Sequence, residues 1–328
     1  MPQKMKYYFK IILSAIIVCI ILWYLTRHYS LKDLGNVILH INWWMLIGGL
    51  IATGFIYIVS GLRWHYLFPQ YPITTSINGT TVAFAANTII PARGGEIVRA
   101  LYLKSRNKIP ISQTIGCIIL ERLLDGISLI IFLALAIIIL GDTLGRDAKM
   151  ILIIGVLLLV IIGLVLISYI IFSKKIDPVL KQIGIRLHIP IKIIQAGKKF
   201  LEVYKKMSTL KFFLSIFISI IISFFFILSL WLFLNSCDIP ITFEKAIVVY
   251  PLITLSISIP ITIGYVGIYD TALIAALILV GIYNNQLFWP VIVVHLLTIV
   301  PVTIYGWLLL YFQYFNKSLL TRNGNGKI

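Results

Sequence analysis

Acidic residues are scarce in this chain. Only 11 of its 328 residues are Asp or Glu, and all charged residues together make up 12%. Soluble domains carry about 25% charged residues. Hydrophobic residues make up 60% of the chain, and its mean hydropathy is +1.02. The composition therefore excludes an ordinary soluble domain and predicts a polytopic membrane protein.

Cysteine is almost absent, and common motifs of enzyme chemistry are missing. Cys19, Cys117 and Cys237 lie in or beside apolar segments without the spacing of metal ligands, which predicts small buried hydrophobic residues. The sequence has no Gly-rich nucleotide-binding loop, no G-x-S-x-G and no D-x-D pair. We therefore expect no ATP hydrolysis by this chain and neither a bound cofactor nor a metal.

Basic residues dominate the charge and give a formal net charge of +17. They cluster in the N-terminal arm, in residues 93–108, in residues 173–211 and in the C-terminal tail. This pattern is typical of cytoplasmic loops, and basic clusters also attract anionic inner-leaflet lipids. We therefore expect both termini in the cytoplasm, a multi-pass protein of the cell membrane, and no nucleic-acid partner. The basic cytoplasmic loop at 173–211 either sets the topology or contains an interfacial amphipathic helix.

Long apolar runs predict an all-α helical bundle that forms one transmembrane domain over residues 1–328. Two further apolar segments, 77–106 and 246–282, are interrupted by proline and glycine. The positive-inside pattern holds only if each of these is a re-entrant hairpin of two half-helices. Residues 1–145 and 146–328 then form an inverted repeat, an architecture of secondary transporters. The six expected full spans are 9–26, 43–67, 112–140, 149–172, 211–235 and 289–312.

The segment N-T-I-I-P-A-R-G-G-E-I-V-R, residues 87–99, places helix breakers and charges between apolar runs. Pro91, Gly94 and Gly95 predict the end of one half-helix and the beginning of the next. Broken backbone with charge near membrane depth is tolerated only where protein or a water-filled cavity surrounds it. The segment, which begins at Asn87, is therefore a candidate functional site.

The charged residues of this segment predict a phosphate site. A helix N-terminus near residues 94–97 would present free N–H groups, and Arg93 and Arg99 would add planar guanidinium donors. Glu96 and Arg99 are three positions apart, so they can pair. The alternative is that this pair only holds the hairpin in place.

A second charged group lies in I-L-E-R-L-L-D-G-I. Glu121 and Asp125 fall on one helix face, and Arg122 is three positions before Asp125. Two acids and one base inside a span leave one acid to pair elsewhere or to stay protonated. The cluster either lines a polar path or locks this helix to Arg93 or Arg99.

The second interrupted segment contains P-I-T-I-G-Y-V-G-I-Y-D. Pro260, Gly264 and Gly267 predict the hairpin break, and Asp270 follows them. An acid near each hairpin tip suits a pseudo-symmetric site, and the alternative is a helix-capping aspartate.

Two basic residues lie within apolar spans. His295 is either a hydrogen-bonded scaffold residue or a proton carrier. Arg63 lies near the end of its span, and we expect its side chain to extend to the membrane surface.

Residues 87–99, 121–125 and 260–270 together resemble the flippase-like integral membrane family. That family includes the transmembrane region of lysylphosphatidylglycerol synthases, the flippase part of the multiple peptide resistance factor. Asp270 stands where the family pattern leads us to expect glutamate, and His295 where an arginine is usual. The residues after the last expected span are too few for a soluble synthase domain, so the resemblance implies translocation rather than aminoacyl transfer.

The predicted function is a lipid flippase or translocase, not an enzyme. Its substrate would be a membrane lipid with a polar, phosphate-bearing head group, such as a phospholipid or a polyprenyl-phosphate-linked sugar. The alternatives are an integral-membrane transferase acting on a lipid-linked substrate, or an accessory subunit. A homo-oligomer is left open. The candidate translocation residues are Asn87, Arg93, Glu96, Arg99, Glu121, Arg122, Asp125, Asp270 and His295.

Overall fold

The computed structural model describes residues 30–90, 93–107, 111–140, 150, 153–157, 160–161, 208–258, 262–283 and 286–324. The secondary structure of these residues is helical and includes no strand, which confirms the predicted all-α class. The elements are α2 (Leu31–Leu39), α3 (Trp43–Leu67), α4 (Ile73–Asn87), α5 (Gly95–Asn107), α6 (Ile111–Leu140), α9 (Thr209–Ser236), α10 (Phe243–Ile257), η1 (Ile263–Tyr265), α11 (Ile268–Leu279) and α12 (Phe288–Gly324).

Four helices in this part of the chain are long and apolar enough to cross a membrane, namely α3, α6, α9 and α12. They contain 25, 30, 28 and 37 residues, whereas about 20 residues span the hydrocarbon of a bilayer. The protein is therefore a multi-pass membrane protein. These helices match the expected spans at 43–67, 112–140, 211–235 and 289–312.

The other two expected spans cannot be compared in this way. The span at 9–26 lies outside the described residues, as do most of the span at 149–172 and nearly all of the basic loop at 173–211. The total number of spans and the inverted repeat therefore stay predictions.

Short polar side chains mark where the long helices begin. Asn42 Oδ1 accepts a hydrogen bond from the Met45 N–H at 3.2 Å and caps α3. Ser208 Oγ accepts from the Lys211 N–H at 3.3 Å and caps α9. Each cap satisfies an N–H group that has no partner within the helix. Helix α3 ends just before Pro69, which cannot continue a helix.

The first interrupted segment forms two short helices, α4 and α5, which pack antiparallel. A Cβ atom on Gly95 would lie 2.1 Å from the Ala83 carbonyl oxygen, and one on Gly79 would lie 3.2 Å from the Leu103 side chain. Glycine at these positions lets the two helices approach closely. The helix break is therefore where the sequence predicts it, although Pro91 itself lies outside the described residues. Whether this hairpin returns to one side of the membrane stays a prediction.

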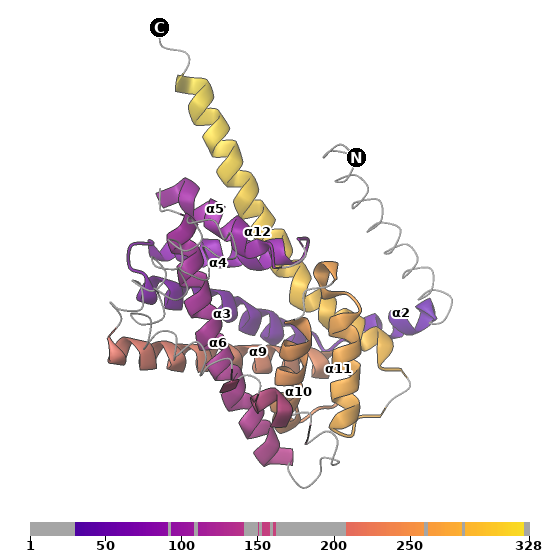
Figure 1. Ribbon diagram of the computed structural model, residues 1–328. Coiled ribbons are helices and arrows are strands. Elements are labelled where there is room, and N and C mark those ends of the chain that lie inside the picture. The colour runs from indigo at the N-terminus through magenta and orange to yellow at the C-terminus, as the bar shows by residue number, and fades with distance from the viewer. Residues whose placement is uncertain are drawn as a thin grey trace, which may run out of the picture.

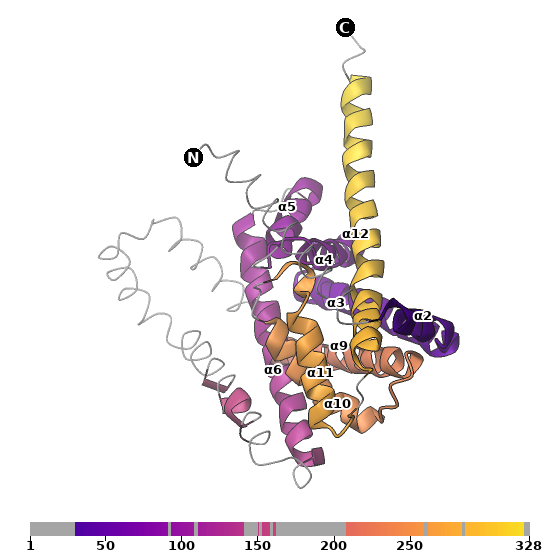
Figure 2. The ribbon, with the colours of Figure 1, turned by 90° about the vertical axis from the view of Figure 1, so that its right-hand side faces the viewer.

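The second interrupted segment forms α10, the short helix η1 and α11, and α10 and α11 lie side by side (Figures 1 and 2). Gly264 and Gly267 in the connection have φ angles of 62° and 83°, a region that favours glycine. A Cβ atom on Gly264 would lie 3.3 Å from the Thr88 carbonyl oxygen, so the tips of the two hairpins touch. Pro260 lies outside the described residues.

The longer helices cross one another around these hairpins. Helices α3 and α9 lie side by side, α6 crosses them, and α12 packs against α4 (Figure 1). Apolar side chains from α9 to α12, such as Phe233, Val249 and Leu277, form one buried core. A second core includes Trp64, Leu103 and other apolar side chains of α3, α5 and α6. The polar site described below lies between these helices.

Helices α3 and α4 approach closely at Gly61. A Cβ atom on Gly61 would lie 2.4 Å from the Ile77 Cα atom, which belongs to the backbone of α4. Because a backbone atom cannot turn aside as a flexible side chain can, the helices would have to separate to admit even a methyl group.

We therefore expect Gly61→Ala to lower the free energy of unfolding by about 1–3 kcal/mol through overpacking. Gly54→Ala is the matched control, because it lies in the same helix and a Cβ atom there would meet nothing within 4 Å. The control should be neutral or stabilise the protein by up to about 1 kcal/mol, since alanine favours helix more than glycine does. Unfolding of both variants in detergent measures the difference, and equal stabilities would contradict the close packing at Gly61.

Candidate functional site

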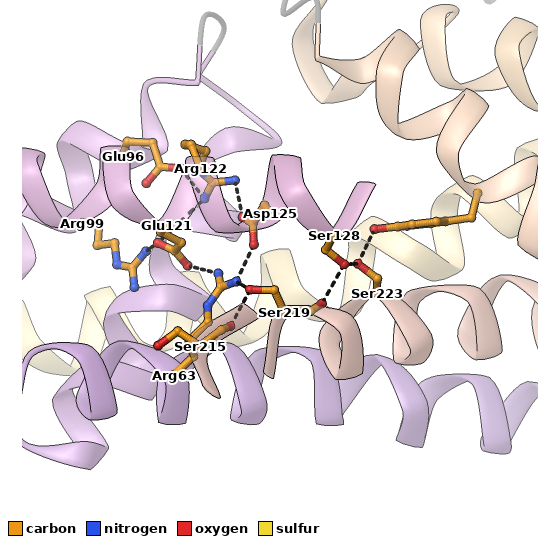
Figure 3. Close-up of polar contacts among 11 residues, drawn as sticks. Arg63, Glu96, Arg99, Glu121, Arg122, Asp125, Ser128, Ser215, Ser219 and Ser223 are labelled. Atoms are coloured by element: carbon orange, nitrogen blue, oxygen red, sulfur yellow. Dashed lines mark hydrogen bonds and ion pairs between the residues drawn. The ribbon is translucent and has the colours of Figure 1, made fainter. Parts of the chain in front are cut away.

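The site is built around the buried carboxylate of Glu121 on α6 (Figure 3). Its Oε1 atom accepts a hydrogen bond from Arg63 Nη2 of α3 at 3.0 Å, and its Oε2 atom accepts from Arg99 Nη1 of α5 at 2.7 Å. All three residues are at most 2% exposed. Buried charges are tolerated when they are paired in this way. Glu121 therefore links three helices through two ion pairs.

A more exposed layer of charge lies beside Glu121. Arg122 Nη2 is 3.0 Å from Glu96 Oε1, and Arg122 Nη1 is 3.3 Å from Asp125 Oδ2. Arg63 Nη1 donates to the other Asp125 oxygen and to Ser219 Oγ of α9. The side chains of Arg122 and Asp125 are 36% and 35% exposed. This layer is therefore accessible from the cavity, whereas Glu121 is buried.

Arg99 contacts side chains of three other helices. Its Nη2 atom donates to Thr80 Oγ1 of α4 at 2.7 Å, and its guanidinium carbon lies 3.7 Å from the centre of the Trp64 ring. The cation–π contact and the Glu121 ion pair hold the guanidinium between α3, α4 and α6. Arg99 therefore joins the first hairpin to the long helices.

Two expectations about charged side chains are wrong. Glu96 pairs with Arg122 rather than with Arg99, although the spacing of three positions allowed the latter. Arg63 does not extend to the membrane surface, because it is 2% exposed and paired with Glu121 and Asp125. The excess acid in residues 121–125 was the signal that another base had to lie nearby.

The first four N–H groups of α5 already have acceptors, which corrects a third expectation. The Gly95 N–H donates to Asn87 Oδ1 at 2.8 Å, and the Glu96 N–H donates to the Arg93 carbonyl oxygen at 3.1 Å. The next two N–H groups donate to the Gly94 carbonyl oxygen. Asn87 thus acts as a cap across the turn, and an anion at this site would have to bind to side chains instead.

Hydroxyl groups continue from the charged cluster towards α10. Ser128 Oγ donates to the Ser219 carbonyl oxygen at 3.2 Å and lies 2.8 Å from Ser223 Oγ (Figure 3). The Tyr250 hydroxyl donates to Ser223 Oγ at 3.1 Å. The chain of hydroxyls joins α6, α9 and α10 in the apolar interior, where each hydroxyl needs a partner.

The charged cluster lines a cavity of about 540 Å³ between the helices. Its charged wall carries Arg63, Arg93, Glu96, Arg99, Glu121, Arg122 and Asp125, which all come from α3 to α6 and the turn before α5. The opposite wall comes from α9 to α12 and carries hydroxyl, aromatic and aliphatic side chains only. A cavity with convergent polar groups is the usual form of a small-ligand site.

Asp270 and His295 lie outside the lining of this cavity. His295 Nδ1 is 2.8 Å from Asp270 Oδ1, and Asp270 Oδ2 accepts from the Gly267 N–H at 2.8 Å. Both side chains are buried, and the His295 ring stacks on Tyr269, which does line the cavity. Asp270 therefore caps α11, which agrees with the alternative of a helix-capping aspartate. Its contact with His295 connects α11 to α12.

Within the residues that the structure describes, no three His, Cys, Asp or Glu side chains form a set that could hold a metal ion. Glu96, Glu121 and Asp125 are instead each bound to arginine. The chemistry this arrangement can perform is the binding of an anion and of hydroxyl groups.

Comparison with protein-family models places most of the chain in a known family. The family model of the lysylphosphatidylglycerol synthase TM region matches residues 11–306. No curated protein and no solved structure matches the chain.

Glu121→Gln should destabilise the protein strongly. It removes the charge between Arg63 and Arg99 and leaves both guanidinium groups buried without their shared carboxylate. Breaking a buried ion pair on one side costs about 3–5 kcal/mol. Thermal unfolding in detergent measures the loss. Glu244→Gln, at an exposed position in the first turn of α10, is the matched control and should change stability far less; similar losses in the two variants would refute the central role of Glu121.

Proposed function

The chain belongs to the family of the lysylphosphatidylglycerol synthase transmembrane region, and we propose that it is a lipid translocase rather than an enzyme. The family name connects it with a membrane lipid that carries a phosphate group. A translocase must move the polar head group of such a lipid across hydrocarbon, where unpaired charge is costly. The proposed substrate is therefore an amphiphile with a phosphate-bearing head group.

The observation that carries this proposal is the cavity of about 540 Å³ with its arginine-rich wall. Guanidinium groups bind phosphate through a planar pair of donors. In the proposed mechanism the phosphate lies against Arg93 and Arg122, the two most accessible arginines of the site, and the acyl chains stay in the surrounding lipid. Hydroxyl groups of the opposite wall take the place of the water that the head group loses.

The hairpin tips supply a means of opening the cavity. Arg93 comes from the turn of the first hairpin and Tyr265 from the connection of the second, and both line the cavity. The tips also touch, because Gly264 packs against the Thr88 carbonyl oxygen. We propose that the hairpins act as gates, so that separation of the two tips admits the head group from one leaflet or releases it to the other.

A direct test fills the cavity without disturbing its walls. Gly126 of α6 lines the cavity, and a Cβ atom there would meet nothing within 4 Å. We expect Gly126→Trp to lower the rate of lipid translocation in proteoliposomes at least about tenfold, because the indole occupies the space the head group needs. The thermal midpoint should stay close to that of the unmodified protein.

Gly54→Trp is the matched control, since a Cβ atom on Gly54 also meets nothing within 4 Å but Gly54 does not line the cavity. It should translocate fluorescent phospholipid at the rate of the unmodified protein. An unchanged rate of translocation in Gly126→Trp would refute the assignment of this cavity as the head-group site. Formation of a new lipid product from a labelled lipid-linked donor, without transbilayer movement, would favour the transferase instead.

A further inference from the structure

We propose that the cavity selects an anionic lipid whose head group beyond the phosphate is uncharged and carries hydroxyl groups, as in a glycerol or sugar phosphate, rather than an aminoacylated lipid. The inference rests on the proposed function and narrows its substrate class. It follows from how the charges of the cavity are distributed and paired.

Every carboxylate that lines the cavity is already neutralised by arginine. Glu121 binds Arg63 and Arg99, with distances of 3.0 and 2.7 Å. Glu96 binds Arg122, and Asp125 lies between Arg122 and Arg63. An ammonium group that entered the cavity would therefore have to compete with an arginine for each of these carboxylates, of which only Glu96 has a buried oxygen, Oε2, without a hydrogen-bond partner.

Arg93 carries the positive charge that is left after the other arginines of the lining have paired with carboxylates. It lines the cavity, and in the described part of the chain no carboxylate lies within 4.0 Å of its guanidinium nitrogens. The lining as a whole contains four arginines and three carboxylates, a formal net charge of +1. Arg122 repels Arg93 electrostatically, whereas Glu96 and Asp125 attract it from a distance, and a bound anion would give Arg93 a direct partner.

The backbone conformation at Arg93 also supports a role of this residue in ligand binding. Its φ angle is 55°, in the left-handed region that residues other than glycine seldom adopt. A residue held in this region by its surroundings is common at ligand sites. The turn thus positions the Arg93 guanidinium at the cavity.

The facing wall offers groups for an uncharged head group. Tyr250, Thr254, Ser258, Tyr265 and Thr298 line it, and it has no charged side chain. Hydroxyls accept and donate hydrogen bonds to the hydroxyls of glycerol or sugar, and tyrosine rings provide flat surfaces for a sugar. An aminoacyl group would bring added positive charge close to a lining that is already positive, and like charges without screening by water repel strongly.

The test compares two lipids that share the same phosphate. Purified protein in detergent is given a fluorescent phosphatidylglycerol, which is then displaced by unlabelled phosphatidylglycerol or by its lysyl ester. We expect phosphatidylglycerol to bind at least about tenfold more tightly, since the ester adds two ammonium groups without a carboxylate to receive them. Equal or tighter binding of the lysyl ester, or no specific binding of either lipid, would overturn the proposal.

Arg93→Gln tests the residue that this selectivity depends on. It should weaken phosphatidylglycerol binding about tenfold and reduce the preference over the lysyl ester, because the uncompensated charge is lost. Arg106→Gln is the matched control, since Arg106 is exposed at the end of α5 and does not line the cavity. Unchanged affinity and preference in Arg93→Gln would remove Arg93 from the site.

Binding and movement separate the two proposals. If phosphatidylglycerol binds selectively but is not translocated in proteoliposomes, the proposed substrate class is supported and the proposed translocase function is refuted. If the lysyl ester binds more tightly and is translocated faster, the translocase function stands and the substrate class fails.

Discussion

The structure depends on one carboxylate that two buried arginines share. Glu121 can lie in the apolar interior because Arg63 and Arg99 bind its two oxygens, and Glu121 in turn supplies a carboxylate to both buried arginines. These residues come from three different helices. Removing Glu121 would leave Arg99 buried without a carboxylate partner among the described residues. The ion pairs therefore fix how α3, α5 and α6 meet, and the cavity forms beside this junction.

Much of the framework could be predicted from the sequence, because its signals are local. An apolar run long enough to cross a bilayer is visible in one window, and the four long helices lie where such runs predict them. Proline and glycine marked the break between α4 and α5. The scarcity of charge singled out Glu96, Arg99, Glu121, Arg122 and Asp125, and the structure brings all five to one cavity.

The partners of these residues could not be predicted, because pairing is decided by the fold. Spacing along a helix suggested a bond between Glu96 and Arg99, but the packing of α6 against α5 gives each a different partner. Arg63 lies 58 positions before Glu121, so no local pattern connects them. The symmetry of the two hairpins also suggested that Asp270 would face the cavity, whereas it binds His295 and the N-terminus of its own helix.

The uneven distribution of charge around the cavity has a consequence for how such a protein can change. All charged groups of the lining come from residues 63–125, where all of them except Arg93 form ion pairs, whereas residues 223–298 contribute only neutral groups. Substitutions in the neutral wall can therefore alter the shape and hydrogen bonding of the cavity without breaking an ion pair. Under the proposed function, a lineage could acquire a different head-group preference through the second half of the chain alone, while the ion pairs of the first half continue to hold the helices together.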